Sequence, residues 1–597
     1  MSHARAGGRE LRHTALNLAV VTEQLDDWVS RLADDVIADA KAKETKVVCA
    51  SGLSPSGPIH LGNLREVMTP HLVADEVRRR GIECEHIISW DDYDRFRKVP
   101  DVPGVTSDWE QHIGKPLTSV PPPQGSAASS WAEHFRLQCE QSLAELGIEY
   151  RGISQTQQYT SGAYTEQILF AMSQRAEIDK VLDQYRTLGP AKAKQQKLSA
   201  EEAAAAAEAE AGSGAAAEDD GSSGTGYYPY KPYCTVCGTD FTTVTAYDDA
   251  STDLTYTCRC GHTETVELRS FRQGKLVWKV DWPMRWSYER VLFEPSGVDH
   301  QSPGSSYVVG KELAPMFGWE RPLGPMYAFV GIKGMAKMSS SKGGVPVAAD
   351  ALQIMEPQLL RWMYARRKPN QAFSIAFDAE IQRMYDEWDS LVVKVANGSG
   401  QAGDVAAYTR ASSVAHSVLP TTPRPVSYRT LASIVDITTG DQEQLLRIVT
   451  SLDPADPVSS VEALRPRLDC VERWVATQMA DEDRTVVRSE VAAALESLSD
   501  LERSGIRILL EGNDSGLPRL EDAWSLEGLT HQVYAVPKVQ RGLAPDQIVK
   551  GDKELAAAQR QFFKLLYNLL VDKDTGPRLP TLLLAVGPER VRSLLGG

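Results

Sequence analysis

Two short segments of this chain combine residue types that suit the binding of a nucleotide. Residues 51–63 contain His60 and Asn63 among glycines and prolines, between an apolar run and a helical pattern at 64–80. A strand followed by a turn and a helix start presents free backbone N–H groups and a favourable helix dipole to a phosphate. Residues 337–343 read Lys-Met-Ser-Ser-Ser-Lys-Gly, a loop whose two lysines suit the outer phosphates of ATP. The two segments therefore predict one nucleotide site.

These two segments and two others resemble the signatures of a known family. The quoted stretches are Pro-Ser-Gly-Pro-Ile-His-Leu-Gly-Asn-Leu-Arg-Glu at 55–66, Val-Asp-Trp-Pro-Met-Arg-Trp at 280–286, Asp-His-Gln-Ser-Pro-Gly-Ser-Ser-Tyr at 299–307, and 337–343. They resemble class I aminoacyl-tRNA synthetases, and most closely the class I lysyl-tRNA synthetases. The likeness runs from about residue 20 to the C-terminus, apart from a low-complexity stretch near 190–226. Asn63 stands where most class I enzymes have a second histidine, and the lysine enzymes resemble this chain there.

The resemblance implies an enzyme that activates L-lysine with ATP, assisted by Mg²⁺, and transfers it to the 3′ end of tRNA(Lys). The substrate carboxylate attacks the α-phosphate directly, so no enzyme nucleophile is needed, and preorganised donors stabilise the developing charge. The implied catalytic residues are His60, Asn63, Lys337 and Lys342, with Lys342 serving although the generic pattern has its second lysine at Ser340. The implied ATP contacts are Pro55, Gly57, His60, Gly62, Asn63, Met338, Ser339, Ser340 and Ser341.

Local geometry adds to the expected nucleotide site. His60 and Asn63 are three residues apart, so we expect them on one face of the starting helix. Gly62 removes a side chain where the adenine or ribose approaches, and Gly57 loosens the preceding turn.

A lysine pocket needs apolar walls for the side-chain stem and a partner for the ammonium group, which gains about 0.5–2 kcal/mol against an aromatic face. We expect a strand at 276–281, on which Trp278, Val280 and Trp282 share one face. The resemblance points to Trp278, His300 and Tyr327 around the lysine, with Gly52 and Ser54 at the edge. The partner of the ammonium stays open between Glu66, Asp281 and backbone carbonyls near Gly52.

Four of the eight cysteines form a separate pattern. Cys234 and Cys237 are a C-x₂-C pair, and 20 residues separate them from Cys258 and Cys260, with glycines that permit tight knuckles. This spacing predicts a structural Zn²⁺ site with reduced thiols, in which His262 is an alternative to Cys260 as the fourth ligand.

The order of patterns predicts an α/β protein with a Rossmann-type parallel sheet, a zinc module inserted into it, and an all-α C-terminal domain. Expected strands at 46–50 and 85–90 alternate with helices at 64–80 and 131–147. The expected division is a leading helix packed on the catalytic domain at 1–44, the first half of the Rossmann domain at 45–186, a low-complexity insertion at 187–226, the zinc module at 227–270, the second half at 271–369, and a helical anticodon-binding domain at 370–597.

Composition narrows the function classes. The 597 residues are 42% hydrophobic with a net charge of −16, which argues against an indiscriminate nucleic-acid binder but allows a local basic surface for tRNA. Candidates for that surface are Arg361, Arg366, Arg367 and Lys368. Because the chain has no long apolar run and no signal core, we expect a cytoplasmic protein that is not bound to a membrane. We also expect a monomer.

The alternatives are another class I synthetase, of the glutamate, arginine or cysteine type, or a non-catalytic tRNA-binding relative. A small-molecule nucleotidyltransferase would not need the long helical half after the lysine loop. Intact His60 and Lys337, and cysteines confined to an insertion, favour the lysine enzyme.

Overall fold

The alternation of apolar runs and helical patterns in the first half produces a parallel sheet. The computed structural model describes residues 25–186, 222–223, 226–298, 300–301, 304–333, 344–514 and 516–596. Strands β1 (Val47–Leu53), β2 (Cys84–Trp90) and β3 (Arg151–Ser154) pair in parallel in the order β1-β2-β3. Parallel bridges from Cys49 to Phe293 and from Phe293 to Leu323 continue the sheet beyond β1. The predicted parallel sheet is confirmed.

Helices cover both faces of this sheet, because successive residues of β1 point to opposite sides. Val47 and Cys49 pack in one hydrophobic core with helices α1 (Trp28–Ala42) and α2 (Leu64–Arg79). Val48 and Ala50 pack in another core, against α9 (Trp278–Glu289) and α10 (Ser306–Leu313). This two-sided burial explains the continuous apolar character of β1 and confirms the doubly wound arrangement.

The expected strand at 276–281 is wrong. Strand β10 (Gly274–Leu276) is short, and helix α9 begins at Trp278. Tryptophan and valine favour strands intrinsically, but burial overrides that preference here. Trp278, Trp282 and Trp286 are spaced four residues apart, so a helix places all three rings on one stripe.

The remaining elements of the first half form small sheets and helices around this core. In the cysteine module β6 (Tyr230–Pro232) pairs with β10, and β7 (Thr242–Tyr247), β8 (Asp253–Cys258) and β9 (Thr263–Glu267) form an antiparallel sheet. The others are α3 (Trp131–Glu145), α4 (Gln155–Ser161), α5 (Thr165–Ser173), α6 (Arg175–Arg186), β4 (Ser222–Ser223), β5 (Gly226–Tyr227), β11 (Ser296–Gly297), β12 (Met326–Tyr327), β13 (Val330–Ile332), α11 (Ala348–Leu352), α12 (Pro357–Ala365) and β14 (Phe373–Ile375).

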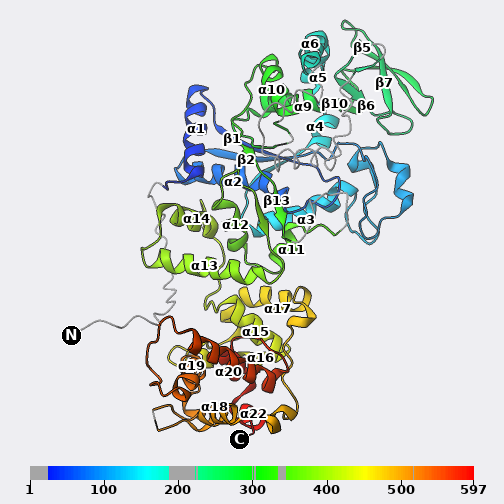
Figure 1. Ribbon diagram of the computed structural model, residues 1–597. Helices are drawn as coiled ribbons and strands as arrows, with labels where there is room; N and C mark the ends of the chain where they lie inside the picture. The colour runs from blue at the N-terminus through cyan, green and yellow to red at the C-terminus, as the bar shows by residue number, and fades with distance from the viewer. Residues whose placement is uncertain are drawn as a thin grey trace.

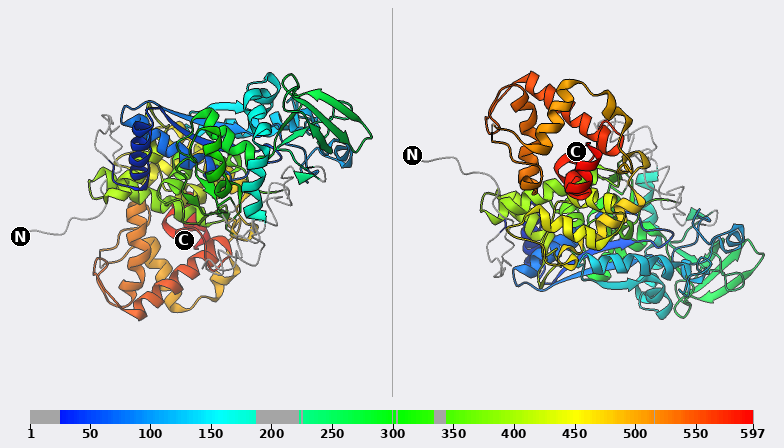
Figure 2. Two further views of the ribbon diagram at one scale, coloured as in Figure 1. Left: turned by 90° about the horizontal axis from the view of Figure 1, so that it is seen from above. Right: turned by 90° about the horizontal axis from the view of Figure 1, so that it is seen from below.

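Helices dominate the second half, as predicted. They are α13 (Glu380–Ala396), α14 (Ala402–Ser412), α15 (Tyr428–Thr438), α16 (Gln442–Leu452), α17 (Arg467–Thr477), α18 (Asp500–Glu511), α19 (Leu526–Gln540), α20 (Lys553–Val571), α21 (Leu579–Val586) and α22 (Pro588–Leu594), with a small hairpin of β15 (Ser413–Val414) and β16 (Ser417–Val418). Figures 1 and 2 show α15–α22 as a body at the end opposite the cysteine module. Among the described residues no helix is both long and apolar enough to span a membrane.

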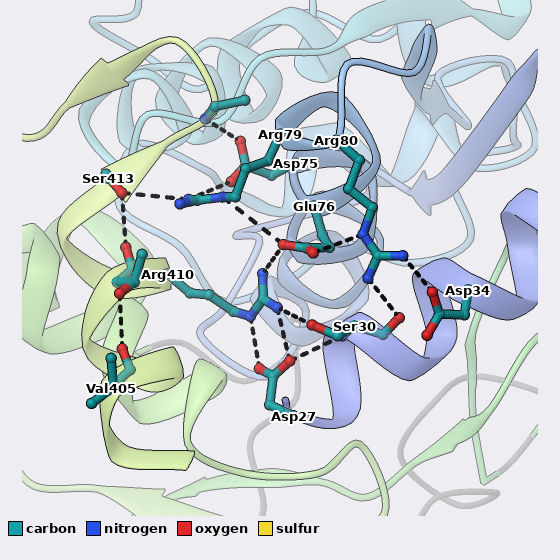
Figure 3. Close-up of polar contacts among 12 residues, drawn as sticks. Asp27, Ser30, Asp34, Asp75, Glu76, Arg79, Arg80, Val405, Arg410 and Ser413 are labelled. Carbon is teal, nitrogen blue, oxygen red and sulfur yellow. Dashed lines mark hydrogen bonds and ion pairs between the residues drawn. The ribbon is translucent and has the colours of Figure 1, made fainter. Parts of the chain in front are cut away.

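A buried ion cluster joins α14 to the first two helices (Figure 3). The Arg410 guanidinium donates to both carboxylate oxygens of Asp27, at 2.7 and 2.8 Å, and to Glu76 at 2.9 Å. It also donates to the Ser30 hydroxyl at 2.9 Å. Burial alone would raise the pKa of Asp27, but hydrogen bonding and the charge of Arg410 hold it below the usual value. The cluster ties α14 to the sheet layer, although α14 follows β1 by several hundred residues.

Candidate active site

The histidine motif lies in a turn, not on a helix. Helix α2 begins at Leu64 with Asn63 as its N-cap residue, so the expectation that His60 and Asn63 share a helix face is wrong. The Asn63 side-chain oxygen accepts from the His60 N–H at 3.2 Å, and this contact closes the turn before the helix. The Gly62 N–H donates to Nδ1 of His60 at 3.1 Å. A neutral His60 therefore carries its proton on Nε2 and can donate from that atom to a phosphate.

The same turn is attached to the residues that follow the lysine loop. His60 forms an antiparallel bridge with Val347, and the Leu61 N–H donates to the Pro346 carbonyl at 3.0 Å. Lys337, Met338, Ser339, Ser340, Ser341 and Lys342 lie outside the described residues, and their roles stay predictions. The turn is thus held against residues 346 and 347, which follow the predicted lysine segment in the sequence.

The other ATP-site candidates belong to the loop between β1 and α2. Pro55 and Gly57 are buried there, while Ser54 is exposed one residue past the end of β1. The Trp131 indole donates to the Ser56 carbonyl at 3.1 Å, so helix α3 helps to hold this loop.

Glu66 stands at the carboxyl end of β1 in the first turn of α2. Its carboxylate accepts from the Gly52 N–H at 3.2 Å and from the Tyr327 hydroxyl at 3.2 Å, and both donors are neutral. Burial, reinforced by the nearby negative charge of Glu294, raises the pKa of Glu66 to about 8. Gly52 and Tyr327, both predicted from the sequence, thus meet at a half-buried acid that a cation could neutralise.

An aromatic wall, formed by Trp278, Trp282 and Trp286, lines a pocket beside Gly52 and Glu294. The rings of Trp278 and Trp282 stack with centroids 5.0 Å apart, and His300 lies edge-on to Trp282 at 5.5 Å. Glu294 accepts from the indole N–H groups of Trp282, at 3.1 Å, and Trp286, at 2.5 Å. Burial raises the pKa of Glu294 to about 7. The predicted residues Trp278 and His300 therefore lie together, joined through Trp282, which the prediction did not include.

Asp281 does not serve as a free partner for a ligand. It is fully buried, accepts from the Tyr159 hydroxyl at 2.6 Å and from Arg285 Nε at 3.1 Å, and lies 3.6 Å from the Lys275 ammonium. Arg285 also donates to Asp91 at 2.6 Å and lies over the Trp278 ring at 5.5 Å. Asp281 thus fixes Arg285 and the wall of the pocket, and Glu66 is left as the stronger of the two carboxylate candidates.

Two acids of the pocket, Glu294 and Asp91, were missed by the reading of the sequence. Both directly follow apolar strand residues, Phe293 and Trp90, at the carboxyl ends of parallel strands, where ligands bind in such sheets. Their position directly after a strand is the sequence signal by which these two acids could have been predicted. Burial raises the pKa of Asp91 to about 6 in spite of Arg285.

The four predicted cysteines lie together. Cys234 and Cys260 are 3.8 Å apart at sulfur, Cys237 and Cys258 are 3.6 Å apart, and all four sulfurs fall within 4.8 Å of one another. Thiolates at 2.3 Å around a tetrahedral Zn²⁺ would stand about 3.8 Å apart, so the cluster fits zinc. His262 instead contacts Glu264 at 3.2 Å and Thr235 at 3.3 Å. The geometry favours Cys260 as the fourth ligand.

The basic residues proposed for tRNA at 361–368 are only partly available. Arg361 is fully buried and donates to the carbonyls of Arg410 and Leu146. The prediction that Arg361 contacts tRNA is therefore wrong. Burial lowers the pKa of Arg361 to about 10. Arg366 is exposed but pairs with Glu387 at 3.0 Å.

A parallel sheet with a histidine-bearing turn that is bridged to the residues just after 337–343 is typical of class I tRNA synthetases. A family described as "tRNA synthetases class I (K)" matches residues 26–416, and the chain belongs to this family. The chain is 63% identical over 579 residues to a lysine–tRNA ligase of Streptomyces coelicolor, covering 96% of this chain and 98% of that protein. It is also 31% identical to the lysine–tRNA ligase of Treponema pallidum, covering 96% and 99%, and 32% identical to that of Pyrococcus horikoshii, covering 94% and 97%.

Proposed function

We propose that this chain is a lysine–tRNA ligase that joins L-lysine to ATP, forming lysyl-adenylate and pyrophosphate, and then transfers lysine to the 3′ end of tRNA(Lys). Membership of the class I (K) family supports the reaction class. The relatives that match nearly the whole chain are lysine–tRNA ligases, which supports the amino acid.

The half-buried Glu66 carboxyl is the observation that carries the choice of lysine. Its polar partners are two neutral donors, and burial disfavours its ionised form. A substrate ammonium would supply the missing positive charge, while the stacked rings of Trp278 and Trp282 would cover the aliphatic stem. Glutamate could not supply this positive charge, because its side chain would bring a further carboxylate to Glu66 and Glu294.

The histidine turn supports the activation step. Nε2 of His60 would donate to the phosphate that the lysine carboxylate attacks, and Asn63 would hold the turn that aims the ring. We assign Lys337 and Lys342 to the pyrophosphate end, because the turn is bridged to the residues just after them. Mg²⁺ would enter on the triphosphate, since in such sites it is held largely by substrate phosphates.

The remaining assignments are part of the same proposal. We assign a structural Zn²⁺ to Cys234, Cys237, Cys258 and Cys260, and anticodon binding to the helical half beyond residue 370. We also propose a cytoplasmic, monomeric enzyme. A cysteine-type synthetase would need the thiolates at the amino-acid pocket, but they lie in the inserted module. A non-catalytic relative would not need the donor geometry of His60.

ATP–pyrophosphate exchange with each of the twenty amino acids, with and without tRNA, tests this function. We expect lysine alone to drive exchange above background, and tritiated lysine to become attached to tRNA(Lys). Ornithine, which is one methylene shorter, is the matched control and should bind more weakly, because its ammonium falls short of Glu66. Exchange driven better by glutamate, arginine or cysteine would contradict the assignment of lysine.

A further inference from the structure

One peptide unit in the histidine turn is held by a hydrogen bond at each end. It is the unit between Leu61 and Gly62, whose N–H donates to Nδ1 of His60 at 3.1 Å. Its carbonyl, that of Leu61, accepts from the hydroxyl of Tyr364 at 2.9 Å. A peptide unit is planar and rigid, so a partner that fixes its carbonyl also fixes the direction of its N–H. The Tyr364 hydroxyl and the His60 ring are therefore linked through one rigid group.

Tyr364 reaches this turn from a distant part of the chain. It lies in the last turn of α12, 303 residues after Leu61, and the two residues are 3% and 0% exposed. Water therefore does not compete for the hydrogen bond between them. A buried carbonyl that loses its donor stays unsatisfied, because no solvent molecule replaces the hydroxyl. The position of the Leu61 carbonyl thus depends on Tyr364.

Helix α12 is itself fixed by contacts with the first half of the chain. The Trp28 indole donates to the carbonyl of Ala365 at 2.9 Å, and Arg361 donates to the carbonyl of Leu146 at 2.8 Å. Eight of the nine residues of the helix are buried. Because a close-packed interior leaves little room for movement, the helix presents the Tyr364 hydroxyl from a rigid support.

The ring of Tyr364 is also held by the helix that follows the turn. Arg65, which is buried in the first turn of α2, donates to the carbonyls of Lys368 and Gln371 at 2.7 and 2.8 Å. Its guanidinium lies over the Phe373 ring, 5.3 Å from the centroid, and Phe373 packs edge-on against Tyr364 with centroids 5.2 Å apart. Arg65 thus joins α2 to the segment after α12 and packs the ring of Tyr364 through Phe373.

The Gly62 N–H decides which nitrogen of the His60 ring carries the proton. A donor at Nδ1 leaves the proton of the neutral ring on Nε2, where the activation step needs it. A carbonyl that accepts a hydrogen bond polarises its peptide unit, which makes the N–H of that unit a stronger donor. The Tyr364 hydroxyl would therefore both orient and strengthen the contact at Nδ1. A phenylalanine at this position would fill the same space but supply no donor.

We propose that Tyr364 is a positioning residue for lysine activation. Its hydroxyl holds the peptide unit between Leu61 and Gly62, so that His60 keeps its proton on Nε2 and directs it to the phosphate of ATP. Tyr364 acts through His60 and not on the substrate. This inference rests on the proposed function, and it predicts that the two residues behave as one unit in the adenylation step.

A double-mutant cycle of His60→Ala and Tyr364→Phe in the full-length protein tests this role. We expect Tyr364→Phe to lower the kcat of lysine-dependent ATP–pyrophosphate exchange about tenfold and to leave the KM for lysine within about twofold, because the lost hydrogen bond serves the activation step. His60→Ala should lower kcat by about 10²–10³-fold. In that background Tyr364→Phe should change kcat by less than about twofold, since residues that act as one unit are not additive.

Tyr428→Phe is the matched control, because it removes the same kind of buried hydroxyl at the junction of α15 and α17. That hydroxyl donates to the carbonyls of Ile354 and Cys470, at 3.0 and 3.3 Å. The control should lose stability much as Tyr364→Phe does, and it should leave kcat unchanged. A comparison of the two variants therefore separates loss of a buried hydrogen bond from loss of the His60 geometry.

A second measurement reads the proton of His60 directly and does not depend on activity. Nitrogen NMR of protein that contains ¹⁵N-labelled histidine distinguishes the two neutral tautomers, and His60→Gln assigns the signal. We expect the ring to be protonated on Nε2 in the unaltered protein and in Tyr428→Phe. Tyr364→Phe should show a mixture of both tautomers, because the Gly62 N–H is no longer held toward Nδ1.

Three results would overturn the proposal. They are an unchanged kcat in Tyr364→Phe, an equal loss of kcat with and without His60, and an unchanged His60 tautomer in Tyr364→Phe. Exchange driven by no amino acid in the unaltered protein would instead contradict the proposed function, and the tautomer measurement would still decide the role of Tyr364.

Discussion

At the scale of single residues, the pocket depends on two carboxyl groups, those of Glu66 and Glu294, whose pKa values are raised. Glu66 is half-buried beside Glu294, and its pKa is raised to about 8, so the neutral carboxyl is the favoured form at pH 7. A bound ammonium favours the ionised form and would displace that proton. Lysine binding and proton release are therefore coupled through one residue.

Lysine binding at pH 7 should release close to one proton, and affinity should rise with pH until about pH 8. Calorimetric titration in two buffers of different ionisation enthalpy measures the number released. Glu66→Gln should abolish the release and weaken lysine binding by tenfold or more, because a neutral amide replaces the carboxylate. Binding without proton release, or with uptake, would contradict the role of Glu66.

The stability of the fold offers an independent control on the same residue. The pKa of Glu66 in the folded protein lies above its ordinary value of 4.5, so the folded state binds the extra proton between these two values. This carboxyl accordingly lowers stability as pH rises from about 4.5 through 8. The Glu66→Gln variant should lack that part of the decline in stability with rising pH.

The sequence predicted which motif residues would meet but not what joins them. Gly52 and Tyr327 meet at Glu66, and Trp278 meets His300 through Trp282. These connections depend on contacts between distant segments, for which the local pattern holds no signal. The position of Glu66 in the first turn of a helix after a strand was readable, and it was one of three named possibilities.

At the scale of elements, local sequence patterns predicted helix or strand correctly where burial and intrinsic propensity favoured the same structure. The apolar strand β1 and the helix α2 were expected because their patterns match their periods. Helix α9 was misassigned because its tryptophans favour strands, while four-residue spacing and burial on the sheet favour a helix. The turn that contains His60 was wrongly predicted as the start of the helix, because the first residues of a helix and the turn before it favour the same residue types.

The cysteine module gives a prediction at this scale. The purified protein should hold about one zinc ion, and Cys237→Ser should lose it, because small metal modules fold with their metal. Hydrogen exchange should then rise across 227–270 while the parallel sheet stays protected. Cys139→Ser is the matched control, since Cys139 is a free cysteine outside the cluster. A zinc-free protein with a protected module would contradict the assignment.

At the scale of the whole molecule, two buried arginines join the halves. Arg410 fills the space between Asp27 and Glu76, and Arg361 holds the Arg410 carbonyl at 2.7 Å (Figure 3 shows the Arg410 contacts). No local pattern could predict a pair separated by 383 residues, such as Arg410 and Asp27. The alternation of strands and helices predicted the sheet, but not that residues beyond 400 would complete the layer beside it.

Arg410→Met should destabilise the protein by about 3–5 kcal/mol, because it leaves the buried Asp27 without its cation and takes one of its guanidinium partners from the buried Glu76. Chemical denaturation followed by tryptophan fluorescence measures the change in the transition of the catalytic half. Arg429→Met, which removes an exposed pair with Asp386, should cost less than about 1 kcal/mol. A loss for Arg410→Met no larger than this control would show that the cluster does not join the halves.

The Arg410 cluster also bears on the order in which the protein is made. A ribosome releases Asp27 and Glu76 early, but Arg410 emerges only after more than 300 further residues. Until then Asp27 lacks the guanidinium that neutralises it and Glu76 has only its helix neighbours, such as Arg80, so burying the two acids would be costly. The layer formed by the first two helices is thus expected to stay loosely packed during synthesis and to close when residue 410 arrives, which makes completion of the nucleotide-binding half a late event of translation.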